Sequence, residues 1–472
     1  MFCQLETLRH CFPPNLRQFL NELPESLDET YEQILRGINK AQKEDARRLL
    51  QCLTVAARPL HVEELAELLA FDFRATSERG IPTLKEDWRW NDQEEAVLST
   101  CSSLIAIVRD GNSRVVQFSH FSVKEYLTSP RLAQSRGDVS RFYIDLNAAH
   151  TILAQACLAT LLQLDGHTGN NGSKGFPLVE YAARHWVEHA QFEGVSSRVW
   201  DGMVDLFDNS KPHFAAWLQV HDMDERWGMF SDGSRDDVGS PLYYAALYGF
   251  HDLVGHLITE HPEQVNARGG LNIAPLPAAL SKKHIHVANL LRKHGAVLDV
   301  RDQDDWTLLH AASDSGSVDV IRWLLDHGAD SNAWDRWRQI PLHRAARNGH
   351  HRAVQVLLEQ KTDVNSQANL GKTALNQAGT FASSHSRGRE ADIVRLLLDH
   401  GADPNIPDDS HSTPLHRASS LGLLDVARLL LSYGANIDEK DEKGRTPFQL
   451  ASEEGHHEMT KLLLEHGAEP QL

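Results

Sequence analysis

The tetrapeptide Thr413-Pro414-Leu415-His416 is one of seven related copies in the second half of this 472-residue sequence. Successive copies lie 33 or 34 residues apart, except for one spacing of 40. Their last residues are Tyr243, Pro277, His310, His343, Asn376, His416 and Gln449. A Gly-Ala pair follows five of the copies, as Gly434-Ala435 does here. A fixed period of this length indicates one small structural unit that is used many times.

The residues of one copy predict the shape of the unit. Thr413 suits the start of a helix, because its hydroxyl can accept a hydrogen bond from a backbone N–H without a partner in the first turn. Pro414 suits the first helical position, and Gly422 ends this short helix. A second helix carries an apolar stripe from Val426 onward and ends at Gly434. One such pair cannot bury its apolar face alone, so neighbouring pairs must stack into a continuous core.

The period of about 33 residues and the T-P-L-H-x-A motif resemble the ankyrin repeat over about half of the chain. The resemblance implies a mainly α fold, with an α-solenoid of about seven repeats over residues 238–472. The first two repeats carry Tyr243 and Pro277 in place of the motif histidine and are interpreted as a cap or as degenerate repeats. The fifth repeat has about seven additional residues, within 382–389, which predict an enlarged polar turn.

Composition narrows the class of protein. A hydrophobic content of 41% and a charged content of 24% are typical of a globular domain. The net charge of −18 argues against binding to nucleic acid and to anionic membranes. No basic and apolar leader is evident and no apolar run reaches membrane length, so we expect no membrane contact.

The number and spacing of the cysteines indicate the cellular compartment of the protein. They are odd in number, include no C-x-x-C pair and all precede the repeats. They are Cys3, Cys11, Cys52, Cys101 and Cys157. These features predict reduced thiols in a cytoplasmic protein, with the nucleus as the alternative.

Residues 22–130 combine helices with one hairpin. The predicted helices, each marked by apolar residues at helical spacing, cover 44–57, 62–70 and 94–101. Two apolar runs, 104–108 and 115–118, flank the turn Asp110-Gly111-Asn112-Ser113 and predict a β-hairpin. This order of elements is typical of a winged-helix domain.

Many winged helices bind DNA, so that function has to be weighed against the residues. The second helix carries Glu63, Glu64 and Glu67, whereas a helix that contacts phosphates needs lysine or arginine. The sequence therefore favours a structural or regulatory role for this domain over DNA binding.

Three segments resemble fungal NACHT-type, NLR-like receptors of the STAND class. Residues 3–9, CQLETLR, resemble the end of the NACHT domain, and residues 23–35, LPESLDETYEQIL, resemble the start of the winged-helix domain that follows it. Residues 119–127 complete the resemblance to that domain. The winged-helix module of the family bears the name of an inositol deacylase, but the resemblance implies no deacylase activity.

The resemblance implies four parts of the chain. They are a remnant of the preceding NTPase domain over 1–21, the winged-helix domain over 22–130, a helical linker over 131–237 and the ankyrin repeats over 238–472. The linker helices are expected at 142–164, 178–192, 199–207 and 214–220. The NTPase itself is absent from this sequence, so the chain is expected to be the C-terminal part of such a receptor or a product that has lost its NTPase.

Two motifs imitate catalytic signatures. His185-Trp186-Val187-Glu188-His189 matches the H-x-x-E-H zinc-protease pattern, but its histidines are expected to flank the apolar face of their helix and no third ligand is evident. Gly371-Lys372-Thr373 imitates the end of a phosphate loop, but Ser366 stands where the first glycine is required. The sequence therefore predicts that the protein is not an enzyme and has no catalytic residue, metal or cofactor.

Unusual residues crowd the finger, the turn between helix pairs, that leads from the third repeat to the fourth. Two tryptophans and two arginines stand there, and the framework expects glycine where Arg338 lies. Tryptophan and arginine dominate the energetics of protein interfaces. The predicted partner-binding site consists of Trp306, Trp334, Arg336, Trp337, Arg338, Arg344 and Arg347. Its partner would be an acidic or aromatic protein segment. The alternative is that the rings cover one another or pack on the neighbouring finger.

These observations favour a non-catalytic module for protein–protein interaction and sensing within an NLR-like signal-transduction receptor. Its partners would bind the concave face and the fingers of the ankyrin array, with no nucleic acid, membrane or small-molecule substrate. The alternative function is an adaptor or substrate-recruiting subunit for an enzyme that acts in trans.

Overall fold

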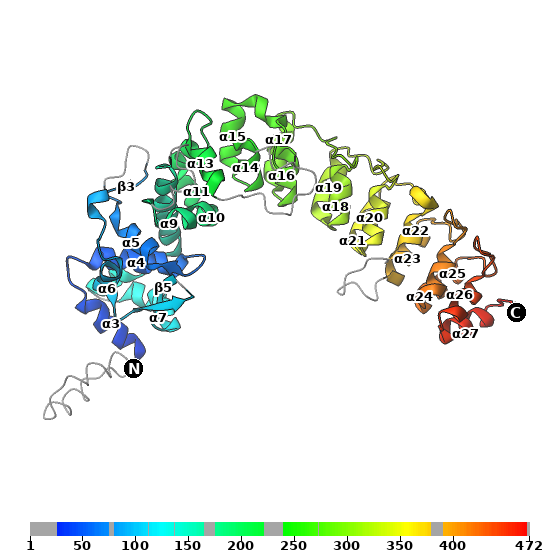
Figure 1. The fold of residues 1–472 in the computed structure, drawn as a ribbon, viewed down its shortest axis with the longest axis horizontal. Coiled ribbons are helices and arrows are strands. Elements are labelled where there is room, and N and C mark those ends of the chain that lie inside the picture. Colours follow the sequence, from blue (N-terminus) through cyan, green and yellow to red (C-terminus); the bar gives the residue numbers. More distant parts are fainter. Residues whose placement is uncertain are drawn as a thin grey trace. The chain divides into compact units, whose positions relative to one another are not determined.

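The computed structural model describes residues 26–74, 80–111, 113–135, 137–164, 175–220, 239–271, 273–378 and 390–469. Those residues belong to two compact units, Met1–Met223 and Asp224–Leu472. Helices dominate both units, and the named strands of the described residues all lie in the first unit (Figure 1). The mainly α fold predicted from the sequence is confirmed.

The N-terminal unit begins with a winged-helix arrangement. In chain order its elements are α3 (Leu27–Gly37), α4 (Lys43–Val55), β1 (Leu60–His61), α5 (Val62–Glu67), η2 (Leu68–Ala70), β2 (Phe71–Asp72), β3 (Thr83–Leu84), η3 (Glu86–Trp88), α6 (Gln93–Cys101), β4 (Ile105–Asp110), β5 (Ser113–Phe118) and α7 (Phe121–Leu127). Polar side chains begin several of these helices. Ser26 and Asp92, for example, accept hydrogen bonds from the backbone N–H groups of Glu29 and Glu95.

The hairpin predicted around Gly111 is confirmed. Strands β4 and β5 pair in antiparallel register from Ile105 opposite Phe118 to Asp110 opposite Ser113. Strand β1 adds to the free side of β5 and completes a sheet of order β1-β5-β4. The sequence did not indicate β1, because two residues are too few to show an alternating pattern.

Helices after residue 127 complete the same unit. They are α8 (Pro130–Gln134), η4 (Asp138–Phe142), α9 (Leu146–Leu161), α10 (Val179–Ala190), α11 (Val195–Arg198), α12 (Trp200–Leu206) and α13 (His213–Val220). Helix α9 packs against both α10 and α4, and Trp186 meets Trp217 edge to face with ring centroids 5.4 Å apart. The predicted helix start at residue 142 is wrong, because Asp145 caps α9. The domain border at residue 131 stays a prediction, and it falls inside a compact unit.

The C-terminal unit contains seven helix pairs in its described residues. They are α14 (Pro241–Leu247) with α15 (His251–Glu260), α16 (Pro275–Ser281) with α17 (Ile285–Lys293), α18 (Leu308–Asp314) with α19 (Val318–Asp326), α20 (Pro341–Arg347) with α21 (His351–Leu358), α22 (Ala374–Gln377) with α23 (Glu390–Asp399), α24 (Pro414–Leu421) with α25 (Leu424–Ser432) and α26 (Pro447–Glu453) with α27 (His457–Glu465). The 3-10 helices η6 (Pro262–Asn266) and η7 (Asn369–Gly371) lie between pairs. From α18 onward, the first helices of successive pairs pack on one another, and so do the second helices. As predicted, Thr413 caps α24 and Gly422 and Gly434 have left-handed backbone angles.

One junction in this unit is less closely packed. Helices α16 and α17 do not pack closely on α18 and α19, although α14 and α16 pack on each other. A cavity of about 580 Å³ lies at the junction, between the turn at Gly295 and the first turn of α18 at Leu308. The two repeats that lack the motif histidine therefore stand somewhat apart from the five regular ones.

The motif histidine of the third repeat links that repeat to the next finger. Nδ1 of His310 accepts a hydrogen bond from the backbone N–H of Thr307 at 3.2 Å. Its Nε2 lies 2.9 Å from the carbonyl oxygen of Gln339, 29 residues further on. The ring is fully buried, so a neutral imidazole that donates from Nε2 satisfies both contacts.

The same link recurs along the array. Nε2 of His343 and Nε2 of His416 each lie 3.1 Å from a carbonyl oxygen in the following finger, those of Lys372 and Arg445. Asn376 takes the histidine position in the fifth repeat, where its side chain accepts from the backbone N–H of Thr373 at 3.0 Å. These histidines therefore have a structural role as links between successive repeats.

Some predictions lie outside the described residues. These are the NTPase remnant over 1–21 and the enlarged turn within 382–389. In the part of the chain that the structure describes, no helix is both long and apolar enough to cross a membrane.

The buried motif histidines make the ankyrin unit sensitive to acid. Burial lowers the pKa of His343 from 6.5 to about 4, opposed by its hydrogen bonds to backbone groups. Below pH 6.5 the unfolded chain therefore binds protons that the folded chain excludes, and stability falls as the pH drops from 6.5 toward 4. The loss from His343 alone is on the order of 3 kcal/mol. Urea unfolding of the full chain between pH 7.5 and 4.5 measures it.

The variant His343→Asn provides the matched comparison, because asparagine already occupies this position in the fifth repeat. It removes the titrating ring and the link to Lys372, so it is expected to be about 1 kcal/mol less stable at pH 7.5. Because the loss expected from His343 exceeds this difference, the gap to the wild type should close and then reverse as the pH falls toward 4.5. Parallel stability curves for the two proteins would contradict the role of His343.

Candidate partner-binding site

The finger that carries Trp334 and Trp337 is built around a buried aspartate. Oδ1 of Asp335 accepts hydrogen bonds from the backbone N–H groups of Trp337, at 2.9 Å, and Gln339, at 2.8 Å. The side chain of Asp335 is completely shielded from water. Asp302, Asp408 and Asp441 hold the other aspartate-containing fingers in the same way. The turn geometry is therefore set by the repeat and not by the tryptophans.

Arg338 occupies a backbone position that favours glycine. Its φ angle is 55°, and the equivalent positions in two later fingers are Gly371 and Gly444, with φ angles of 67° and 74°. A left-handed conformation costs a non-glycine residue about 1–2 kcal/mol. The glycine position predicted at Arg338 is confirmed in backbone geometry, and the repeat tolerates an arginine there at that cost.

Arg344 holds two of the rings in place. Its guanidinium carbon lies 4.3 Å from the ring centroid of Trp306 and 5.3 Å from that of Trp337. One guanidinium nitrogen, Nη2, forms an ion pair with Asp335 at 2.9 Å. Arginine prefers such stacked and paired surroundings. Arg344 is buried, so it acts mainly as an internal support of the site.

Trp334 and Trp337 keep a large part of their surface in water, with 51% and 38% exposed. Arg338 lies over the Trp334 ring at 4.8 Å and Arg336 over the Trp337 ring at 5.4 Å. Arg336 also pairs with Asp304 of the preceding finger. Arginines, and not other tryptophan rings, therefore cover these two rings. The alternative interpretation, in which a tryptophan ring packs on a neighbouring finger, fits Trp306 better than it fits Trp334.

A cavity of about 390 Å³ opens beside Trp337. It spans three repeats, and its lining residues are Trp337, Gln339, Arg344, Arg347, Asn369, Leu370, Lys372, Gln377 and Arg417. Arg347 lines this cavity. The sequence reasoning missed Lys372 and Arg417, because one looked like part of a phosphate-loop imitation and the other like an ordinary helix residue.

The phosphate-loop imitation at Gly371-Lys372-Thr373 is part of the ankyrin framework. Gly371 takes the left-handed turn position of its finger. The Thr373 hydroxyl accepts a hydrogen bond from the backbone N–H of Asn376 at 3.2 Å and so caps α22. Gly371 and Thr373 therefore serve as a turn residue and a helix cap of the repeat.

The H-x-x-E-H motif lies on α10 and does not present two free histidines. His189 is completely buried, which corrects the expectation that it flanks the apolar face. Its Nδ1 lies 2.9 Å from Nδ1 of His150 and its Nε2 lies 2.8 Å from the Tyr181 hydroxyl. Burial lowers the pKa of His189 to about 3. Both ring nitrogens are occupied, and the described residues contain no group of three side chains placed to hold a metal.

The acidic helix α5 is internally neutralised. Glu64 forms an ion pair with Arg58 at 2.6 Å and Glu67 pairs with Arg89. Both glutamates are buried. The helix therefore offers no basic surface to a phosphate backbone, in agreement with the preference for a structural role over DNA binding.

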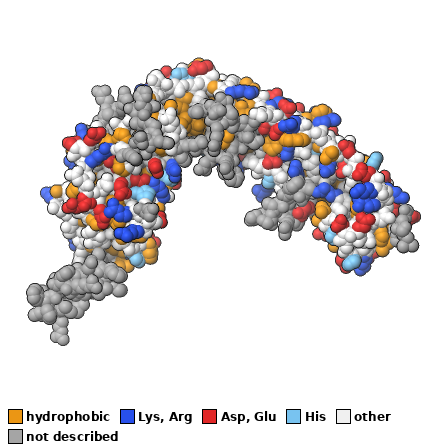
Figure 2. Space-filling view, in the orientation of Figure 1, with side chains coloured by type: hydrophobic (Ala, Val, Ile, Leu, Met, Phe, Trp, Pro, Cys, Tyr) orange, Lys and Arg blue, Asp and Glu red, His pale blue; other side chains and the backbone are white. Residues whose placement is uncertain are grey.

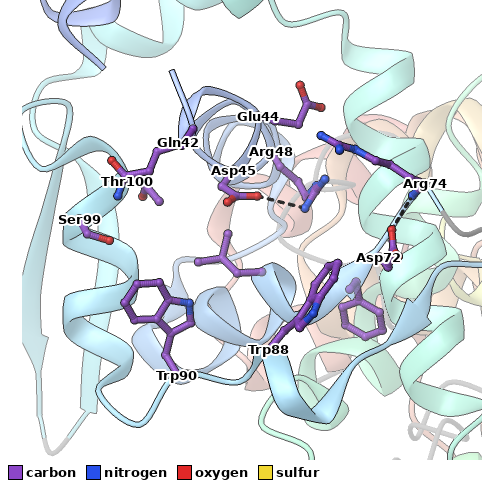
Figure 3. Close-up of a pocket in the computed structure, with 13 residues that line it drawn as sticks. Gln42, Glu44, Asp45, Arg48, Asp72, Arg74, Trp88, Trp90, Ser99 and Thr100 are labelled. Atoms are coloured by element: carbon purple, nitrogen blue, oxygen red, sulfur yellow. Dashed lines mark hydrogen bonds and ion pairs between the residues drawn. The ribbon is translucent and has the colours of Figure 1, made fainter. Parts of the chain in front are cut away.

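A second cavity, of about 750 Å³, lies in the N-terminal unit (Figure 3). The rings of Trp88 and Trp90 line one side, and Asp45 and Arg48 line the other, with their charged atoms 3.5 Å apart. Burial raises the pKa of Asp45, opposed by Arg48. The charges in this cavity largely compensate one another, so it shows no preference for a ligand of either sign.

Comparison with known families agrees with both halves of the structure. The family model for ankyrin repeats matches three times, at residues 242–335, 331–408 and 380–472. The model described as the GPI inositol-deacylase winged helix domain matches residues 31–139. The chain thus contains ankyrin repeats in its C-terminal part and a winged helix of this type in its N-terminal part.

Two curated relatives were found. A protein of Monascus ruber named azaphilone pigments biosynthesis cluster protein L is 34% identical over 288 residues, which cover 56% of this chain and 58% of the relative. A putative ankyrin repeat protein of fowlpox virus is 64% identical over 31 residues, which cover 7% of this chain and 4% of the relative. The chain thus spans less than two thirds of the length of either relative.

Two aspartates of the site test how it is held together. The change Asp335→Ala leaves the buried Arg344 without its counterion and removes the turn acceptor, so it should lower the free energy of unfolding by about 3 kcal/mol or more. The change Asp304→Ala removes a partly exposed pair with Arg336 and should cost less than about 1 kcal/mol. Urea unfolding of the full chain measures both. Equal losses in the two variants would show that burial of the Asp335 pair does not matter.

Proposed function

We propose that the chain is a non-catalytic module for protein–protein interaction and sensing, and that its ankyrin array binds partners around Trp334 and Trp337. The observation that carries this proposal is the pair of exposed rings on a finger whose backbone is fixed by buried Asp335. An exposed tryptophan on a rigid support loses little conformational entropy on binding and buries a large area. The seven predicted residues remain the proposed site, with Trp306 and Arg344 as its support.

The cellular role that we propose is regulation within an NLR-like signalling system. The support is the winged helix, which resembles the domain that follows the NTPase in NACHT-type receptors. Such a module would sense a ligand with its repeats and control a NACHT NTPase. We further propose that it acts in the cytoplasm without a cofactor.

A second candidate is an adaptor that recruits a substrate to an enzyme acting in trans. The observation that favours it is the similarity to the relative that is named for an azaphilone pigment biosynthesis cluster. Both candidates need the same binding surface, and they differ in the identity of the partner. A NACHT protein as the partner supports the first candidate, and a biosynthetic enzyme, ligase or kinase supports the second.

Partner capture with the variant Trp334→Ala/Trp337→Ala tests the proposal. Proteins retained by the full chain from an extract of the source cells are identified by mass spectrometry and then tested as purified proteins. We expect the double variant to bind the direct partner at least tenfold more weakly, because central aromatic residues each contribute about 2 kcal/mol or more.

The control is Tyr433→Ala, which removes an exposed aromatic ring from a different part of the same array. It should bind the partner as the wild type does. Unchanged affinity in the tryptophan variant, with a normal circular dichroism spectrum, would rule out the proposed surface.

A further inference from the structure

The cavity beside Trp337 has an excess of positive charge. Four cationic side chains line it, and no carboxylate side chain does: Arg344, Arg347, Lys372 and Arg417. Asp335 neutralises Arg344. The side chains of Lys372 and Arg417, in contrast, make no hydrogen bond or ion pair with any residue that the structure describes. On the face shown in Figure 2, acidic and basic side chains are mixed over the ankyrin unit, so a pocket without acid is a local feature.

A comparison of the repeats shows that Arg417 lacks the direct ion pair that its counterpart in the fourth repeat makes. Arg344, Gln377 and Arg417 occupy the same position of three successive first helices. In the fourth repeat the arginine pairs with Asp335. In the sixth repeat Asp408 stands at the same distance along the chain, but it bonds only to the backbone N–H groups of its own turn, at 3.0 Å each.

The environment of Arg417 is unfavourable for a charge. Burial lowers the pKa of its guanidinium, and the charge of Asp408 opposes that effect. Partial removal from water penalises the charged form of a side chain that has no direct ion pair. An anionic group that entered the cavity would offset this cost and would be held by it.

The rim of the cavity adds an apolar contact. Leu370 is 64% exposed and has a φ angle of 65°, which is unusual for leucine. Its finger is fixed on both sides, because the N–H of Asn369 donates to the Trp337 carbonyl at 2.9 Å and the N–H of Asp409 donates to the Leu370 carbonyl at 3.0 Å. Trp337 and Leu370 therefore form a fixed apolar edge beside the cationic cavity.

We propose that this cavity binds an acidic side chain of an extended segment in a partner protein. The carboxylate would lie between Lys372 and Arg417, and an adjoining apolar residue would lie against Trp337 and Leu370. The proposal rests on the proposed function, since it specifies the chemistry of the partner at that surface. A volume of about 390 Å³ suits one or two side chains. The net charge of −18 disfavours a nucleic acid, whose many phosphates would meet the rest of the surface.

A defined peptide tests the proposal with the full chain. The probe is a fluorescein-labelled octapeptide of alternating glutamate and leucine, and the comparison peptide carries glutamine in place of glutamate. Fluorescence anisotropy should show tighter binding of the glutamate peptide by at least tenfold, and this advantage should shrink as salt is added. The variant Lys372→Gln/Arg417→Gln should lose at least tenfold in affinity for the glutamate peptide. The variant Arg428→Gln, which changes an exposed arginine of α25, should lose none.

Several results would overturn the proposal. They are no binding of the glutamate peptide, equal binding of the two peptides, or equal affinity in wild type and double variant. Tighter binding of an eight-residue oligothymidine at the same site would instead assign the cavity to phosphate.

Circular dichroism tests whether each variant is folded. If partner capture still depends on Trp334 and Trp337 while the peptide test fails, only the carboxylate assignment is wrong. If capture does not depend on them, the proposed function itself fails.

Discussion

The hydrogen bond from a motif histidine to the next finger is the contact on which the ankyrin half depends. His310, His343 and His416 each cap their own helix through Nδ1 and meet a carbonyl of the following repeat through Nε2. The link spans 29 residues each time, so it fixes the register of one repeat against the next. Since the register is constant, residues at equal positions of successive repeats come to lie side by side. One side of the cationic cavity follows from this, because the link from His343 ends at the carbonyl of Lys372, which lines the cavity.

Much of the fold could be predicted from sequence, because the determining signals are local. The cap at Thr413, the left-handed glycines and the hairpin around Gly111 each depend on a few neighbouring residues. What could not be predicted depends on distant partners. The burial of His189 requires His150 and Tyr181, which lie 39 and 8 residues away. The loose junction before α18 depends on how two repeats fit, which no single motif encodes.

The candidate site shows the same contrast between residues that local sequence signals identify and residues whose role depends on distant partners. Trp334, Trp337 and Arg338 were found because they depart from the repeat pattern. Arg417 fits the pattern in sequence and is unusual only because Asp408 does not pair with it, which coordinates alone reveal. The structure also separates the seven predicted residues by role. Arg344 and Trp306 are part of the support, whereas Trp334 and Trp337 present exposed rings to a partner. A buried ion pair and a water-facing aromatic surface are both needed, because the surface can bind tightly only if its backbone does not move.

In the proposed complex, a protein partner lies against the edge formed by Trp337 and Leu370. Photo-crosslinking measures this contact directly. The chain carries benzoylphenylalanine in place of Leu370, or in place of Tyr433 for comparison, and is irradiated in an extract of the source cells. We expect a specific crosslinked protein from position 370, joined through a segment that contains aspartate or glutamate, and no such product from position 433. Identical products from both positions, or none from position 370 while the partner is still captured, would contradict it.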